Sequence, residues 1–458
     1  MKNTSNNLGT ESIGKLLVRL AIPAITAQLI NALYNIVDRM YIGNIKDVGT
    51  PALTGLGVTL PIIIIITAFS SLIGMGGAPR AAIEMGKGDN EKAEKILGNC
   101  AVLLLISSVI LTVVFSIYKE PLLYMFGASK NTITYATDYL GIYVLGTVFV
   151  LFTLGLNAFI TTQGFAKTSM MTVLIGAVLN IVLDPLFIYV FNMGVKGAAL
   201  ATIISQAVSA VWVVVFLLGG KTKLRLRFSN FKLESGIILP VLALGLSPFI
   251  MQSTESLLSI SFNYSLQKYG GDNAVGAMTI MASVMQLAML PLTGLTQSAQ
   301  PIISYNYGAR KTDRVKKTFK LLLISSLVFT TLTWMVAMFF PEILIALFSS
   351  DESLVGITVY GIRIYMAALF MLGAQTACQQ TFVALSQAKV SLLLALLRKI
   401  ILLIPLIFIL PGFIDDKVTA VLLAEPVADF LASVTTVIVF AIMIKKILDT
   451  NNISKEDL

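Results

Sequence analysis

Apolar runs long enough to cross a lipid bilayer recur along this chain almost from end to end. Crossing a hydrocarbon core of about 30 Å takes about 20 helical residues, and short polar connections separate runs of that length. The first and seventh runs are longer than a bilayer needs and contain Pro23 and Pro248, so we expect kinked or tilted helices there. The pattern predicts about twelve transmembrane helices, near residues 16–42, 52–75, 95–118, 136–162, 168–191, 195–218, 236–266, 274–300, 318–340, 355–385, 389–410 and 418–444.

The composition supports an integral membrane protein and argues against an enzyme. Of the 458 residues, 56% are hydrophobic and only 12% are charged, which is far more apolar than a soluble domain tolerates. The chain has no histidine, and it contains no nucleophile elbow, Walker loop or HExxH motif. Cys100 and Cys378 lie inside apolar runs, so neither a disulfide framework nor a thiolate metal site is expected. The polar segment before Leu16 lacks the features of a cleaved signal peptide.

The distribution of basic residues predicts the orientation in the membrane. Most of the 33 Lys and Arg residues fall in loops that share one side when both termini are cytoplasmic, as the positive-inside rule requires. The net charge of +9 then reflects topology and contact with anionic lipid, and no nucleic-acid partner is expected. We therefore expect a multi-pass protein of the cell membrane with both termini in the cytoplasm.

The two halves of the sequence repeat each other. PRAAIEMG at 79–86 matches PIISYNYG at 301–308, and AKTS at 166–169 matches AKVS at 388–391, both with an offset of 222 residues. Two parallel bundles of this kind are typical of alternating-access transporters, whose sites lie between the halves, although a duplicated scaffold is also compatible. The predicted domains are a first lobe at 1–219, a basic cytoplasmic linker at 220–235, a second lobe at 236–444 and a cytoplasmic tail at 445–458.

Four oxygen-bearing side chains in the first half are predicted at one depth in the membrane. Asp38 lies about 19 residues past the basic start of its span, or ~28 Å of helix, and so reaches the outer half. Asp184 reaches the same half, Asn180 shares its helical face, and Thr202 lies near the outer start of the sixth span. Buried carboxylates are costly and suggest function, although Asp38 could pair with Arg39 and Asp184 could only cap a proline break. The oxygens suit Na+, and buried carboxyls suit H+ equally.

Glu255 is the clearest acidic residue in the spans of the second half. If it faces a cavity, it would attract cationic molecules against an adaptable wall that includes Met281. A hydrogen-bonded structural glutamate or a second proton site is the alternative. The candidate substrate-binding residues are Glu255, Gln28, Asn31, Tyr34, Met285 and Met289.

A further group of charges lies deep in the last two spans. Glu425 and Asp429 are four residues apart, and Arg398 and Lys399 lie too deep for their charges to reach the surface easily. We expect these four residues to form ion pairs with each other, in a structural role.

Several segments resemble the multidrug and toxic compound extrusion (MATE) family, in particular its MepA-like branch. They are the first span LAIPAITAQLINALYNIVDRMYIG, the loops GKGDNEKAEK and GARKTDRVKK after the second span of each half, NIVLDPLFI and GVKGAALATIISQ in the fifth and sixth spans, and AEPVADFLA in the twelfth. The resemblance covers nearly the whole chain.

The resemblance implies a V-shaped pair of six-helix lobes around a central cavity. It also implies export of organic cations in exchange for Na+ or H+, with the cation site on the four oxygen-bearing residues of the first half. The register partner of Asp184 in the second half is apolar, Ile404 or Leu406, so we assign coupling to the first lobe.

The sequence thus predicts a monomeric, all-α antiporter for small organic cations, with no cofactor besides the coupling ion. Two alternatives stay open. A lipid-linked oligosaccharide flippase of the same superfamily would favour a strongly cationic cavity, whereas the acids dominate here. A non-transporting scaffold or receptor would need neither the deep acid pair nor the repeat.

Overall fold

The structure, a computed structural model, describes residues 8–46, 48–220, 222–345 and 352–452, and these residues form helices and loops without a β-strand. The first half contains α1 (Ile13–Gly43), α2 (Gly49–Lys87), α3 (Asn90–Met125), α4 (Ile133–Leu145), α5 (Thr147–Thr162), α6 (Ala166–Pro185), the π-helix η1 (Leu186–Val190) and α7 (Val195–Leu218). After η2 (Phe228–Asn230) come α8 (Ser235–Gly308), α9 (Thr312–Phe339), α10 (Pro341–Ile345), α11 (Glu352–Tyr365), α12 (Leu369–Ala384), α13 (Ala388–Leu396), the π-helix η3 (Leu397–Leu403), α14 (Ile404–Ile409), η4 (Leu410–Gly412) and α15 (Lys417–Asn452).

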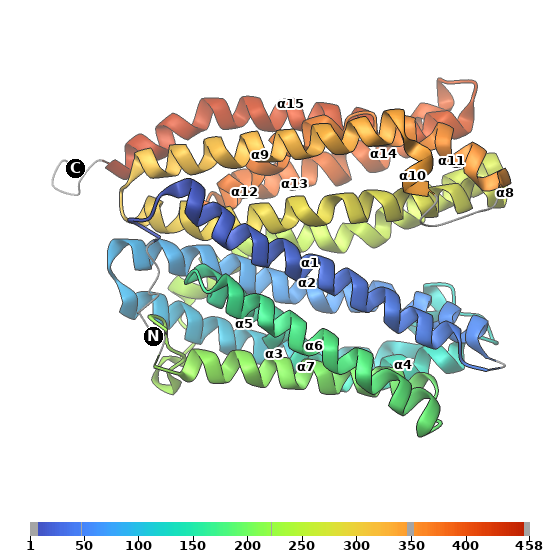
Figure 1. Ribbon diagram of the computed structural model, residues 1–458, viewed down its shortest axis with the longest axis horizontal. Helices are drawn as coiled ribbons and strands as arrows, with labels where there is room; N and C mark the ends of the chain where they lie inside the picture. The colour runs from blue at the N-terminus through green and yellow to red at the C-terminus, as the bar shows by residue number, and fades with distance from the viewer. Residues whose placement is uncertain (1–7, 47, 221, 346–351, 453–458) are drawn as a thin grey trace.

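The described helices account for the twelve predicted spans. Nine are long and apolar enough to cross a membrane, and two bent pairs, α4 with α5 and α11 with α12, raise the number to eleven. The 74-residue α8 provides the twelfth because it is interrupted at Gly271 and folds back on itself (Figure 1). Gly271 has φ 65° and ψ −161°, a backbone conformation that essentially only glycine adopts.

Two details add to the sequence-based expectation. Helix α1 continues through Pro23 and α8 continues through Pro248, so the break in α8 comes from Gly271 and not from the proline. The tilt of α1 is visible in its oblique course between the bundles (Figure 1). At the other end of the chain, α15 continues to Asn452, so residues 445–452 of the segment predicted as a tail are helical.

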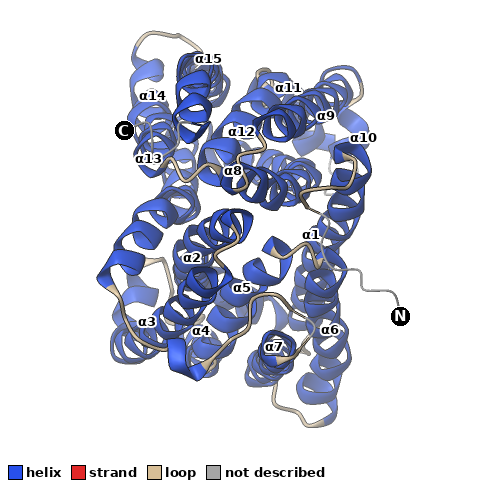
Figure 2. Ribbon diagram, turned by 90° about the vertical axis from the view of Figure 1, so that its left-hand side faces the viewer, coloured by secondary structure: helices blue, strands red, loops and turns tan. Residues whose placement is uncertain are grey.

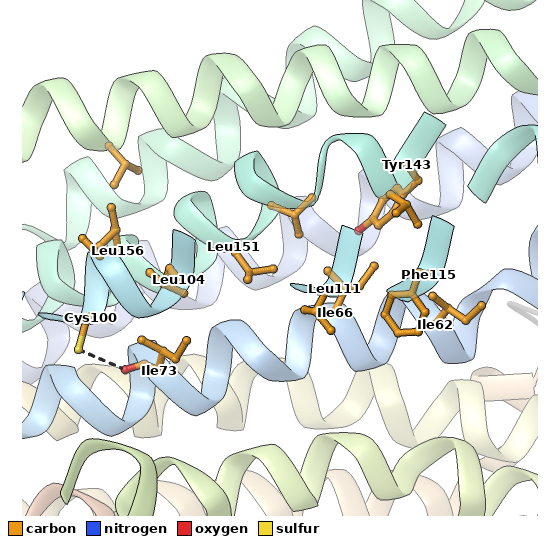
Figure 3. Close-up of a cluster of buried hydrophobic side chains, with 14 of the residues drawn as sticks. Ile62, Ile66, Ile73, Cys100, Leu104, Leu111, Phe115, Tyr143, Leu151 and Leu156 are labelled. Carbon is orange, nitrogen blue, oxygen red and sulfur yellow. Dashed lines mark hydrogen bonds between the residues drawn. The ribbon is translucent and has the colours of Figure 1, made fainter. Parts of the chain in front are cut away.

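The helices form two bundles, with α2 to α7 in one and α8 to α15 in the other, and α1 lies along the first (Figure 2). Each bundle has its own buried apolar core. In the first, Ile62 and Ile66 of α2 pack with Leu104 and Leu111 of α3 and with Leu151 of α5 (Figure 3). Helices with apolar side chains on all faces are what the composition predicts for a bundle that packs inside and contacts lipid outside.

The backbones of α2 and α8 come close where these two helices end, as they also do at Gly76 and Gly245. A Cβ atom added at Gly86 would collide with the carbonyl oxygen of Tyr305, and one added at Gly308 would collide with that of Ile83. The contact is reciprocal, because the two glycines and the two carbonyls are related by the same 222-residue offset. The repeated segments PRAAIEMG and PIISYNYG are therefore the surfaces through which the two bundles cross.

The start of α1 packs mainly against the second bundle. Leu8, Leu16 and Leu20 are buried in a core cluster that contains residues of α8, α9 and α12. Arg314 of α9 donates hydrogen bonds to the carbonyls of Leu8 and Glu11, at 3.0 and 2.7 Å. The first helix thus connects the two bundles at the end of the molecule where α2 and α8 cross.

Candidate ion and substrate sites

Three helices of the first bundle bring the four predicted polar side chains together. The Asn180 amide donates to Asp184 Oδ1 on the next turn of α6 and to Thr202 Oγ1 on α7, both at 3.3 Å. The carboxyl group of Asp38, from α1, lies beside that of Asp184, and the two groups interact electrostatically. All four residues are at least nine-tenths buried.

Asp184 occupies the end of α6, where the backbone changes pitch. Pro185 follows it, and the chain continues as the π-helix η1, so the carboxyl group lies at an irregular point of the span. Short π-helical segments are frequent at functional sites. The proline break expected from the sequence is present, but Asp184 also contacts the other polar side chains and does more than cap it.

The cluster contains oxygen atoms with no protein partner. Asp38 Oδ1, Asn180 Oδ1 and Asp184 Oδ2 are buried and accept no hydrogen bond from the described residues. No ion pair within the described chain joins Asp38 to Arg39, and the Arg39 side chain is exposed. Two neighbouring carboxylates repel each other unless a proton or a cation lies between them. The donor set of carboxylate, amide and hydroxyl oxygens fits a hard cation as well as a proton.

Three tyrosines lie beside this site: Tyr139 and Tyr143, which were not among the sequence-based candidates, and Tyr34, which was a substrate candidate. Tyr139 and Tyr143 lie four residues apart on α4, are buried, and stack with ring centroids 6.0 Å apart. The Tyr139 hydroxyl lies near Thr202, and Tyr34 lies within electrostatic range of both acids. The four-residue spacing of Tyr135, Tyr139 and Tyr143 was the signal that could have revealed an aromatic face towards the acids.

A second polar cluster lies in the second bundle. Arg398, on the π-helix η3, donates to Asp429 at 2.6 Å and to Glu425 at 3.4 Å, so the predicted pairing with these two acids is present. Lys399 differs from the expectation, because it pairs with Glu255 of α8 and donates to the carbonyl of Met251 at 3.1 Å. Successive residues of η3 thus face different helices, α15 and α8.

The other candidate substrate residues fall into two groups. On α1, Gln28 donates to Gln297 of α8 at 3.1 Å and so joins the two bundles, while Asn31 and Tyr34 lie one and two turns further along. In the second half of α8, Met285 and Met289 are half-buried at the edge of the core. Met281 is buried within that core, which makes it a packing residue and not part of an exposed wall.

Comparison with known proteins defines the class. The MatE family model matches residues 23–186 and 248–409, one segment in each bundle, so the chain belongs to the MatE (multidrug and toxic compound extrusion) family of membrane transporters. Curated relatives include the multidrug export protein MepA of Staphylococcus haemolyticus, 26% identical over 92% of both chains. MepA of Staphylococcus aureus strain N315 is 24% identical over 96% of both chains.

Solved structures show the same fold. The MATE multidrug transporter DinF-BH, solved in complex with a ligand, is 36% identical, covers 96% of this chain and 98% of its own, and superposes with a TM-score of 0.88. A MATE crystal structure in the bent conformation has a TM-score of 0.92 at 21% identity and covers 99% of this chain and 100% of its own. The predicted all-α, two-bundle transporter fold and the family resemblance are confirmed.

Proposed function

We propose that this protein is a multidrug efflux antiporter of the cell membrane, which exports amphipathic organic cations in exchange for H+ or Na+. The proposal is supported by relatives named as multidrug export proteins and by the likeness to a multidrug transporter solved in complex with a ligand. Both termini are cytoplasmic in this proposal, the protein acts as a monomer, and the lobes are those divided by the linker at 220–235.

The observation that carries the coupling assignment is the set of unpartnered oxygens on Asp38, Asn180 and Asp184. Buried acceptors without donors are unfavourable, and two adjacent buried carboxyl groups make them more so. A proton on one carboxyl group relieves the repulsion and supplies a donor. A Na+ ion would instead be held by the carboxylate, amide and hydroxyl oxygens together, so the two ions compete for one site.

The driving force is sufficient without a nucleotide. Net inward movement of one positive charge across a potential of about 100 mV, as when two H+ or Na+ ions enter for each monovalent cation exported, releases ~2.3 kcal/mol. Since ~1.4 kcal/mol corresponds to a factor of ten, this supports about a fortyfold concentration gradient of an exported substrate. A gradient of that size is enough to protect a cell from a toxic cation.

Efflux of ethidium from proteoliposomes identifies the coupling ion. We expect a pH gradient in Na+-free buffer to drive export, because protonation alone resolves the repulsion between the two acids. Export under a Na+ gradient at equal pH, with none under the pH gradient, would establish an obligate sodium site. If neither gradient drives export of any organic cation, the antiporter proposal fails, and a flippase or a non-transporting role replaces it.

Substitution of either acid tests the site. Asp38→Asn and Asp184→Asn are each expected to lower gradient-driven efflux to the level of empty liposomes, because the amide neither binds a proton nor repels its neighbour. The control is Asp138→Asn, since Asp138 is a half-exposed acid on α4 that pairs with Lys196 at 3.4 Å. Wild-type efflux in both purified acid variants would remove the assignment.

A further inference from the structure

The polar cluster of the second bundle lies on helices equivalent to those of the ion site. The first bundle uses its first, fifth and sixth spans, which are α1, α6 and α7, and the second uses the corresponding α8, η3 and α15. The individual residues do not correspond, because the 222-residue offset pairs Glu255 with Leu33 and Arg398 with Gly176. Each bundle has therefore acquired its own charged groups at the same junction of helices.

The second cluster differs from the first because it contains its own cations. Glu255, Glu425 and Asp429 supply three carboxylates, while Arg398 and Lys399 supply two positive charges. The guanidinium group of Arg398 lies between Asp429 and Glu425, and all three side chains are largely buried. A planar guanidinium that bridges two acids is held firmly. Glu425 and Asp429 are therefore not available to bind a further cation.

In the ion pair between Lys399 and Glu255, only the glutamate is accessible to solvent. The Lys399 side chain is 6% exposed, whereas that of Glu255 is 58% exposed. One turn earlier on α8, Gln252 accepts a hydrogen bond from Ser71 and donates one to Thr67, both on α2 and both at 2.8 Å. Glu255 thus follows directly after a point where α8 touches the other bundle, with its carboxylate accessible from outside the cluster.

We propose that Lys399 is a tethered competitor that occupies Glu255 until a cationic substrate displaces it. The inference rests on the proposed function. It identifies Lys399 as the residue that sets how strongly the site prefers a positively charged substrate over an uncharged one. A lysine ammonium is a point charge on a flexible stem, and on release from Glu255 it keeps the carbonyl of Met251 as an acceptor. The displacing charge balances the surplus carboxylate, so a monovalent cation leaves the cluster neutral and an uncharged molecule gains nothing.

Competition of this kind makes an unusual prediction, because loss of a polar residue should strengthen binding. The apparent affinity of a substrate falls when its site is occupied by a competitor, and it recovers when the competitor is removed. Lys399→Gln should therefore bind ethidium, a permanent monocation, roughly five- to tenfold more tightly than wild type. Glu255 stays accessible to solvent in this variant, so it does not become a buried unpaired charge.

The experiment measures equilibrium binding of ethidium to the purified full-length transporter in lipid nanodiscs. Lys399→Arg keeps the tethered charge and is the matched control, with an affinity expected near that of wild type. Glu255→Gln should weaken ethidium, and Glu255→Gln combined with Lys399→Gln should bind it as Glu255→Gln does alone. Phenanthridine, the uncharged parent ring, should bind all these variants equally.

An unchanged or weaker affinity of Lys399→Gln for ethidium overturns the inference, as does an equal gain for phenanthridine. If that variant does not fold, Lys399→Met and the double variant test the same competition. The proposed function fails separately, when wild-type protein neither binds nor exports ethidium. Wild-type export together with no gain in Lys399→Gln rejects only the role of Lys399.

Discussion

At the scale of single residues, a proton and a metal ion would make different demands on the proposed ion site, because they need different numbers of oxygen atoms. A proton needs one carboxyl oxygen, whereas Na+ needs several ligands at once. Thr202 lies at the edge of the cluster, where its hydroxyl accepts from Asn180. It is therefore the residue whose loss should affect the two ions differently.

Thr202→Val removes this hydroxyl with almost no change of shape. We expect export driven by a pH gradient to stay within about twofold of wild type, and export driven by Na+ to fall roughly tenfold, because one oxygen ligand is lost. The measurement is ethidium efflux from proteoliposomes under each gradient. Thr59→Val is the matched control, since Thr59 is fully buried and its hydroxyl donates, among the described residues, to the Leu56 carbonyl of its own helix at 2.7 Å. An equal loss under both gradients contradicts this separation.

The residue scale also shows what the sequence could and could not predict. The contact of Asn180 with Asp184 follows from their spacing of four on one helix, and the positions of Asp38 and Thr202 follow from counting residues from the membrane surface. The partner of Lys399 could not be predicted from the sequence. In a regular helix adjacent side chains point about 100° apart, but η3 is a π-helix and its pitch changes that angle, so the direction of the Lys399 side chain does not follow from that of Arg398. Met281 could not be told from Met285 without knowing which face of α8 meets the core.

At the scale of elements, the crossing at the ends of α2 and α8 depends on two glycines. Helices in membranes approach closely where small residues let their backbones touch, and Gly86 and Gly308 each face a carbonyl oxygen of the opposite helix. The sequence marks these positions through the repeat, but nothing in the repeat says that the two copies face each other. That information is in the three-dimensional arrangement alone.

Gly86→Ala should separate the ends of α2 and α8, because its methyl group has no room beside Tyr305. We expect a wider distance distribution between spin labels placed at the two helix ends, measured by pulsed electron paramagnetic resonance, together with an efflux rate reduced several-fold. Gly57→Ala is the control on the same helix, since nothing lies within 4 Å of the added Cβ. An unchanged distance distribution in Gly86→Ala would mean that the crossing tolerates a methyl group.

At the scale of the whole molecule, the two lobes are joined at one end by several independent contacts. Besides the glycine crossing and the start of α1, the linker is bound to the first lobe: Glu94 of α3 accepts from the backbone of Arg225 at 3.0 Å and pairs with the Arg227 side chain at 2.9 Å. The linker is therefore fixed to the first lobe at these two residues. The sequence indicated its basic charge and its place between the halves, but not the acid that holds it.

Alternating access requires the contacts between the lobes to separate during each cycle, and the hydrogen bonds from Gln252 to α2 are a place to test this. Ser71→Cys with Gln252→Cys, in a background with Cys100 and Cys378 replaced by serine, can be joined by a short thiol cross-linker that a reductant cleaves. We expect cross-linking to stop efflux and reduction to restore it, because the lobes can then no longer rock apart. Thr161→Cys with Ser169→Cys is the control, since these hydroxyls lie 2.8 Å apart within the first lobe and a link between them moves with it as a rigid body. Full efflux by the cross-linked protein would show that this contact stays closed throughout transport, and the movement would then have to occur within the lobes.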